Sequence, residues 1–247
     1  MTELLSLKDA YLRQCVANLE AVEENDSASA LAFGQTVFYP TGGGQPSDFG
    51  KIIFASDDGG KTLEVSNVVK RGGTAWHEVK DASGMPANAV GSQATLEINW
   101  ERRHALMRMH TAAHVLGAVF FAKGFLFTGN QLEEKQSRID FSVEPFDRSV
   151  FEQGVAEANK ILETNAAIKV FELPREEALE IPGAVKLANV LPPSIAMLRV
   201  VEIEGVDKQI DGGTHVRSLA EVGKIVIEKL ENKGSGKKRV YFSLERP

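Results

Sequence analysis

The stretch WERRHALMRMHTAAHVLGAVFFAK, residues 100–123, separates two different patterns in this chain of 247 residues. It contains no proline and a single glycine, and residues such as Leu106, Met109 and Ala113 recur at the spacing of one helix face. We therefore predict one long helix here. His110 lies within it, and the residues on either side of the stretch follow other periodicities.

Before this helix, from Leu31 to Trp100, short apolar runs alternate with turns. The runs are LAFGQTVFYP, KIIFAS, KTLEVSNVVK, TAWHEV and ATLEINW, and the turns contain GGG, DDGG, RGG and SGMP. Short runs bounded by such turns are typical of antiparallel strands. This half of the sequence predicts a small antiparallel sheet or barrel.

After the helix, predicted strands and helices are mixed, as in an α+β domain. Strands are expected at SRIDFSV, IKVFEL, MLRVVEI, GKIVIEK and RVYFSL, a short helix at REEALEI, and a longer one from about Asp147, its N-cap, to Thr164. We expect two domains, residues 1–95 and 96–247, and find no internal repeat.

Composition predicts a cytoplasmic protein. The single cysteine, Cys15, excludes an intramolecular disulfide, fits a reducing compartment, and lies in an expected amphipathic N-terminal helix. We see no secretory signal and no segment that approaches the roughly 20 apolar residues of a membrane span. No membrane association is expected, and the sequence carries no signal for an oligomeric state.

The net charge of −6 argues against a generally basic nucleic-acid-binding protein. Two local clusters of basic residues nevertheless occur in the sequence. Arg102, Arg103 and Arg108 precede or enter the histidine region, and KGSGKKR occupies residues 233–239. These groups are candidate contacts for a phosphate backbone, with solvated surface as the alternative.

Three histidines are candidate metal ligands. His110 and His114 are four residues apart, so both imidazoles project from one helix face, and His215 follows two glycines in QIDGGTHV. Three protein ligands with an open position are typical of catalytic zinc. Asp211 is a possible fourth ligand. The alternative is that these are buried histidines bonded to neighbouring backbone.

The same spacing also occurs in HExxH metallopeptidases, where a glutamate beside the first histidine is the general base. Here Thr111 occupies that position. Without the base, the peptidase interpretation lacks a mechanism.

Four motifs in order, FYPTGGGQPSDFG, the HTAAH helix, SRIDF, and DGGTHV followed by EVG, resemble the freestanding alanyl-tRNA editing proteins of the AlaX family. The resemblance is to the medium-length, two-domain members and covers nearly the whole chain. It implies a translation-factor-like β-barrel followed by the zinc-binding editing domain that alanyl- and threonyl-tRNA synthetases share.

The resemblance further implies an ATP-independent deacylase that removes serine, and in this subgroup glycine, from mischarged tRNA(Ala). His110, His114 and His215 carry over as zinc ligands. Asp211 stands where many members have cysteine, so it either binds the zinc ion or lies behind the ligands and orients a histidine or water. The alternative function is a non-catalytic tRNA-binding module whose structural metal is closed by four protein ligands.

Serine must be distinguished from alanine by its hydroxyl, and a pocket that hydrogen-bonds this group can do so strongly. Thr128, in FLFTGNQL, is our candidate, and Gln131 is the second choice. The alternative is that Thr128 begins a turn with Gly129 and Asn130.

Gly42, Gly43 and Gly44 lack the following helix and lysine of a phosphate loop, so no nucleotide cofactor is expected. They form either a tight turn or, as the resemblance implies, a loop that faces the editing domain and helps select the charged tRNA.

Overall fold

The computed structural model describes residues 1–25, 28–55, 61–182, 195–234 and 236–246. Its contacts divide the chain into two compact units, Met1–His104 and Ala105–Pro247. The division falls inside the long helix, whereas the sequence placed the domain boundary before it.

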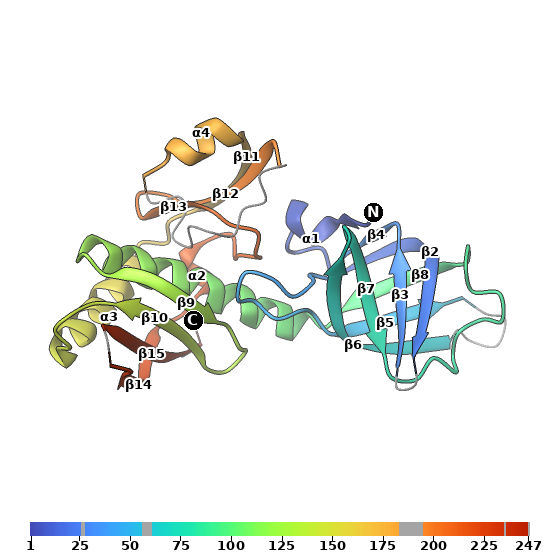
Figure 1. The fold of residues 1–247 in the computed structure, drawn as a ribbon, viewed down its shortest axis with the longest axis horizontal. Helices are drawn as coiled ribbons and strands as arrows, with labels where there is room; N and C mark the ends of the chain where they lie inside the picture. Colours follow the sequence, from blue (N-terminus) through green and yellow to red (C-terminus); the bar gives the residue numbers. More distant parts are fainter. Residues whose placement is uncertain (26–27, 56–60, 183–194, 235, 247) are drawn as a thin grey trace. The chain divides into compact units, whose positions relative to one another are not determined.

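Unit 1 is built around a closed antiparallel barrel, which confirms the sequence prediction (Figure 1). The strand order around it is β2-β3-β7-β6-β5-β8. The strands are β2 (Gln14–Asn25), β3 (Ala28–Phe33), β5 (Gly50–Phe54), β6 (Lys61–Arg71), β7 (Thr74–Val79) and β8 (Gln93–Ile98). Short elements precede or follow them: β1 (Glu3–Leu4), α1 (Leu5–Lys8) and β4 (Gln35–Thr36).

The prediction of an N-terminal helix around Cys15 is wrong. The helix α1 ends at Lys8, and Cys15 lies in β2, opposite Leu96 of β8. Ala17 and Leu19 point into the barrel core while Val16, Asn18 and Glu20 are exposed, which is the two-residue period of a strand. Closure of the barrel requires this strand, because β2 pairs with both β3 and β8.

The barrel core contains a fully buried histidine, His77. Its Nδ1 lies 2.9 Å from the carbonyl oxygen of Leu31, and its Nε2 lies 2.8 Å from the hydroxyl of Thr36. The Nδ1–H donates to the carbonyl and the hydroxyl donates to Nε2, so a neutral ring satisfies both contacts. Burial lowers the pKa of His77 to about 4, although the bond to Leu31 opposes this shift.

We expect unit 1 to lose stability as the pH falls from 6.5 towards 4. The pKa of His77 is 6.5 when unperturbed and about 4 in the fold, so between these values the unfolded chain gains a proton that the folded chain does not. The free energy of unfolding should decrease by at most about 3 kcal/mol. Urea unfolding followed by tryptophan fluorescence reports on this unit, because both tryptophans, Trp76 and Trp100, belong to it. His77→Gln should flatten this pH dependence, and an unchanged slope would contradict the assignment.

Unit 2 contains a four-stranded antiparallel sheet in the order β14-β15-β10-β9. Its elements are β9 (Leu126–Gln131), β10 (Ser137–Ser142), β14 (Ile225–Asn232) and β15 (Lys237–Leu244), with helices α2 (Trp100–Ala122) and α3 (Arg148–Leu162). Phe120 of α2 lies 4.8 Å from Phe141 of β10 and 5.4 Å from Phe151 of α3, ring centre to ring centre. These rings join both helices to the sheet. Asp147 caps α3 as predicted, accepting the backbone N–H of Ser149 at 2.8 Å.

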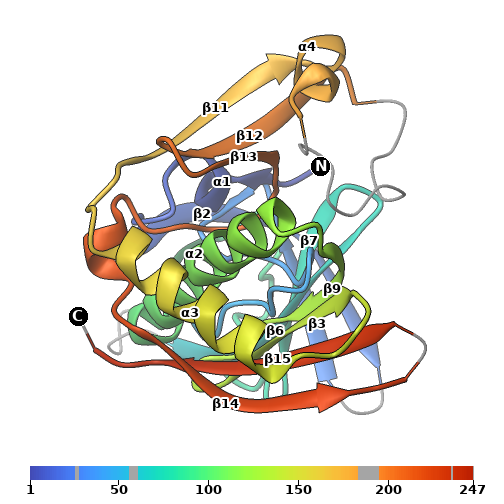
Figure 2. The same ribbon diagram turned by 90° about the vertical axis from the view of Figure 1, so that its left-hand side faces the viewer.

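A second sheet of unit 2 has the order β11-β12-β13. It comprises β11 (Ile168–Pro174), β12 (Met197–Ile203) and β13 (Asp207–Ile210), with α4 (Arg175–Glu180) and the 3₁₀ helix Leu219–Glu221 nearby in sequence. Figures 1 and 2 show α2 between this sheet and the strands β14 and β15. The α+β class is confirmed, while β9 and β13 were not predicted.

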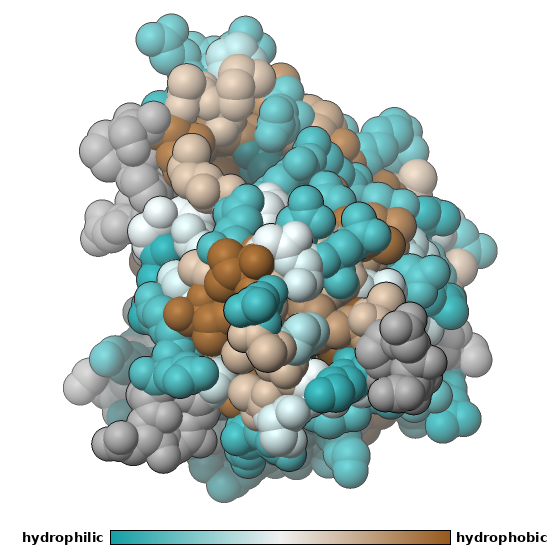
Figure 3. All heavy atoms as spheres, turned by 90° about the vertical axis from the view of Figure 1, so that its right-hand side faces the viewer, coloured by the Kyte–Doolittle hydropathy of each residue, from teal (hydrophilic) through white to brown (hydrophobic). Residues whose placement is uncertain are grey.

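The helix α2 has the length and composition of a membrane-crossing helix, contrary to the expectation that no segment does. Of its apolar window, 72% is buried inside the protein, as in the core helix of a globular domain. Apolar side chains elsewhere, such as Val16 and Val90, are exposed, and on the face shown in Figure 3 hydrophobic atoms form small groups among hydrophilic ones. Scattered groups of this kind are normal for protein surfaces.

Candidate metal centre

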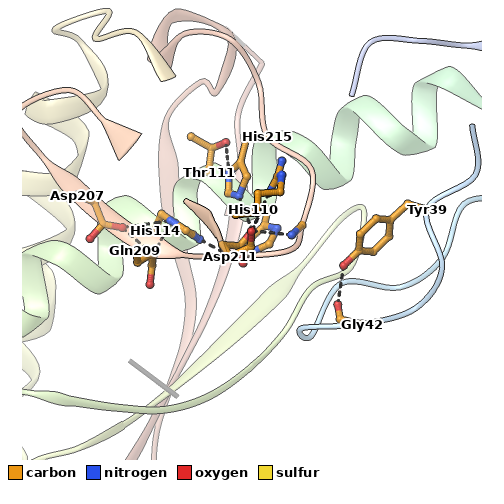
Figure 4. A network of polar contacts seen from close by, with 11 residues as sticks. Tyr39, Gly42, His110, Thr111, His114, Asp207, Gln209, Asp211 and His215 are labelled. Atoms are coloured by element: carbon orange, nitrogen blue, oxygen red, sulfur yellow. Dashed lines mark hydrogen bonds and ion pairs between the residues drawn. The ribbon is translucent and has the colours of Figure 1, made fainter. Parts of the chain in front are cut away.

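Unit 2 brings together four side chains from two places in the sequence (Figure 4). His110 and His114 project from one face of α2, while Asp211 and His215 come from the loop after β13. One ligand atom from each lies within 4.8 Å of every other, and the three histidines are buried. The predicted helix pair and the glycine-containing loop therefore meet at one point.

The three histidine rings face the carboxylate of Asp211 with their Nε2 atoms. Asp211 Oδ1 lies 3.5 Å from His110 Nε2 and 3.9 Å from His114 Nε2, and Oδ2 lies 3.1 Å from His215 Nε2. Two atoms bound to one zinc ion at about 2.0 to 2.1 Å can be at most about 4.2 Å apart, and each of these three separations is within that limit. Imidazole nitrogen and carboxylate oxygen are also ligand types that zinc accepts.

The electrostatics favour metal binding at neutral pH. Burial lowers the pKa of His110 to about 3 and of His215 to about 4, and it also lowers the pKa of His114. Burial opposes ionisation of Asp211, but the neighbouring His110 and His215 hold its pKa well below the usual range. The site thus presents neutral imidazoles and an ionised carboxylate, the forms that coordinate metals.

Three residues contact the candidate ligands from behind, and the sequence did not predict these contacts. Thr111 Oγ1 lies 3.1 Å from His215 Nδ1, and Asp207 Oδ2 lies 3.1 Å from His114 Nδ1. Gln209 Nε2 donates to Asp207 Oδ2 at 2.7 Å. A signal was present in DKQID: Asp207, Gln209 and Asp211 alternate, and such residues share one face of a strand.

Arg199 on β12 is a further residue that the sequence did not suggest. Its Nη1 donates to the carbonyl of Asp211 at 2.8 Å and lies 3.8 Å from Oδ2 of the same residue. The backbone N–H of Gly213 donates to Asp211 Oδ2 at 2.6 Å. These contacts from a strand and from the loop itself fix the carboxylate that faces the histidines.

Thr128 and Gln131 both lie on β9, and Thr128 is exposed. The register places Gly129 opposite Asp140 and Phe127 opposite Phe141, so Thr128 is the extra residue of a β-bulge. The alternative of a turn that begins at Thr128 is wrong, since residues 128–130 belong to the strand. Gln131 donates to Glu133 at 3.3 Å and accepts from Arg138 at 3.2 Å. Their roles in a substrate pocket remain predictions.

The three glycines form a tight turn in unit 1. Gly42 and Gln45 exchange backbone hydrogen bonds of 3.1 and 2.9 Å, and Gly43 and Gly44 have φ angles of 60° and 84°. These angles favour glycine. Tyr39 donates its hydroxyl to the Gly42 carbonyl at 3.0 Å (Figure 4). A role for this turn in selecting tRNA remains a prediction.

The three arginines that were candidate phosphate contacts bond to other residues of the protein. Arg103 is fully buried and pairs with Asp48, and Arg102 is buried and donates to the Ser47 carbonyl at 3.1 Å. Arg108 donates to the carbonyls of Val222 and Glu245 at 2.9 and 2.7 Å.

Within KGSGKKR, Lys238 is buried and bonded to Glu144 and Asn232. Arg239 pairs with Asp140 at 2.6 Å. These contacts, like those of the three arginines, hold segments of the fold together, because guanidinium and ammonium groups are rarely buried unless paired.

Each of the two units contains residues that match a known protein family. Residues 9–102 match the family of class II (A) tRNA synthetases, and residues 198–241 match the threonyl and alanyl tRNA synthetase second additional domain. A barrel followed by an α+β unit of this type places the chain among the proteins related to the aminoacyl-tRNA synthetases.

The relatives that align with nearly the whole chain indicate a more specific family. The alanyl-tRNA editing protein AlaX-M of Saccharolobus solfataricus is 40% identical over 99% of this chain and 100% of its own length. AlaX-M of Pyrococcus horikoshii is 30% identical over 99% of both chains. The alanine–tRNA ligase of Methanobrevibacter smithii is 32% identical over 98% of this chain but 27% of its own length. The chain belongs to the AlaX-M family of alanyl-tRNA editing proteins.

Proposed function

We propose that this protein is an ATP-independent, zinc-dependent deacylase that removes serine, and also glycine, from mischarged tRNA(Ala). The observation that carries the proposal is the cluster of three buried histidines, His110, His114 and His215, with Asp211, in a chain that aligns with AlaX-M proteins over 99% of its length. These relatives are alanyl-tRNA editing proteins, which supports tRNA(Ala) as the partner. A cytoplasmic location follows from this role in translation.

The residues of the site suit ester hydrolysis without a strong protein base. A bound zinc ion would polarise the ester carbonyl or lower the pKa of a water molecule to about 7. Thr111 occupies the position of the glutamate that is the general base in metallopeptidases, and its hydroxyl lies beside His215 Nδ1. An aminoacyl ester is already activated, so the chain's own residues need only hold the ligands in place and exclude bulk water.

We assign the remaining roles by the same resemblance. Gly42, Gly43, Gly44 and Gln131 belong to substrate binding, and Thr128 and Asp211 to the catalytic site. Thr128 recognises the amino acid, and Asp211 either binds the metal or orients a histidine or water behind the ligands. Residues 1–95 form the accessory barrel domain and residues 96–247 the editing domain. The rival function is a non-catalytic tRNA-binding module, which direct coordination of the metal by Asp211 would favour because four protein ligands close a structural zinc site.

The experiment that separates these functions is release of serine from Ser-tRNA(Ala), measured beside Ala-tRNA(Ala), before and after metal removal and after zinc is restored. Rapid serine release that requires zinc and spares alanine is the expected result. Intact esters under every condition, with tRNA still bound, would establish the non-catalytic module instead.

Thr128→Val is expected to narrow the preference for Ser-tRNA(Ala) over Ala-tRNA(Ala). A pocket group that bonds the serine hydroxyl is left unpaired by alanine, and its removal takes away that distinction. The ratio of kcat/KM on the two esters measures the effect. Thr128→Ser keeps the hydroxyl and serves as the control. Equal ratios in the wild type and both variants would remove Thr128 from the pocket.

A further inference from the structure

The ring of His114 lies between two carboxylates in Figure 4, with Asp207 on one side and Asp211 on the other. Its Nδ1 is 3.1 Å from Asp207 Oδ2, and its Nε2 is 3.9 Å from Asp211 Oδ1. The side chains of His114 and Asp207 are 7% and 6% exposed. Water therefore competes little for the contact between them.

A neutral imidazole carries its hydrogen on one nitrogen only, and a metal requires the lone pair of the other. An ionised carboxylate can only accept hydrogen bonds. Asp207 therefore favours the form of His114 in which Nδ1 carries the hydrogen. In that form Nε2, the nitrogen that faces Asp211, is free to bind a metal.

Gln209 contacts both members of this pair. Its Nε2 donates to Asp207 Oδ2 at 2.7 Å and also lies close to His114 Nδ1. The amide can donate to Nδ1 only when that nitrogen carries no hydrogen, so Gln209 and Asp207 favour opposite tautomers of His114. Asp207 is the charged partner, and once Nδ1 carries the hydrogen the amide donates to the carboxylate alone. Because the two residues are two apart on β13, their side chains share the face of the strand that meets α2.

We infer that Asp207, held by Gln209, is a positioning residue that fixes the tautomer and orientation of His114 for metal binding. The inference rests on the proposed zinc site. His215 has a neutral partner, Thr111, at its own Nδ1, so the two histidines differ in the charge behind them. Hydrogen bonds to an ionised acceptor are roughly twice as strong as neutral ones, so His114 is held the more tightly.

The test measures zinc affinity of the metal-stripped full chain by competition with a chelating dye. Asp207→Leu should lower the affinity by about 10- to 100-fold, the loss typical of groups behind metal ligands. Asp207→Asn keeps an acceptor and should lose less. Lys208→Gln is the matched control, because Lys208 is on the same strand, 3.7 Å from Glu202, and should leave the affinity unchanged.

A second readout is the tautomer of His114 in ¹⁵N-histidine spectra of the metal-free protein. The form with hydrogen on Nδ1 should dominate in the wild type and in Asp207→Asn, and decrease in Asp207→Leu. A purely structural role would not move this ratio in a folded variant. If Asp207→Leu does not fold, Asp207→Ala should shift the same two readouts in the same direction.

Unchanged zinc affinity and tautomer in Asp207→Leu, or an equal loss of affinity in Lys208→Gln, would overturn the inference. Neither readout requires tRNA, so this outcome is separate from failure of the proposed function. A wild-type protein that binds zinc but releases no serine would overturn the deacylase proposal alone.

Discussion

Serine release from Ser-tRNA(Ala) is expected to fall by about a thousandfold when His215 is replaced by alanine. A catalytic metal contributes several kcal/mol of transition-state stabilisation, and each 1.4 kcal/mol is about a factor of ten in rate. The replacement removes one of three buried imidazoles and leaves Asp211 without the partner that lies 3.1 Å away. Single-turnover rates and the zinc content per chain measure the two consequences together.

Two controls accompany this variant. His104→Ala removes a half-buried histidine of unit 1 that stacks on Trp100, and it should keep both zinc and activity. Asp211→Cys should keep the zinc ion, since thiolate is a good zinc ligand, whereas Asp211→Ala should bind it more weakly if the carboxylate coordinates. Full activity in a His215→Ala protein without metal would contradict the zinc mechanism.

The largest effect on stability is expected from Asp48→Leu in unit 1. Arg103 and Asp48 are both completely buried, and Arg103 Nε donates to the carboxylate at 3.0 Å. Removal of one partner leaves an uncompensated buried charge, which costs about 3 to 5 kcal/mol. Asp48 also accepts the backbone N–H of Tyr39 at 2.6 Å, so the base of the glycine turn loses a contact as well.

Urea unfolding followed by tryptophan fluorescence measures this loss. The double variant Asp48→Leu, Arg103→Met should recover part of the stability, because it removes the unpaired charge but leaves the carbonyls of Ala10 and Val37 without their donor. Glu23→Leu breaks the exposed pair with Arg71 and should change the free energy of unfolding by less than about 1 kcal/mol. Equal losses in Asp48→Leu and Glu23→Leu would show that burial of the first pair has no energetic consequence.

Much of the fold follows from local periodicity. The helix α2, the strands β5 to β8, and the cap of α3 by Asp147 were predicted because each pattern depends on residues close in sequence. The strand β2 was missed because the alternation of Ala17 and Leu19 competes with an amphipathic pattern in the preceding residues. The barrel decides between them, since only its closure supplies β8 as the pairing partner of the first part of β2.

The sequence alone determined that His110 and His114 share a helix face and that His215 follows a glycine-containing loop. The tertiary structure decided what surrounds them: Asp207 reaches His114 across 93 positions, and Thr111 reaches His215 across 104. It likewise decided that Arg103 is a buried anchor, which a cluster of arginines in the sequence did not indicate. Helix and strand periods act over a few residues, whereas burial and the pairing of charges depend on segments that only the folded chain brings together.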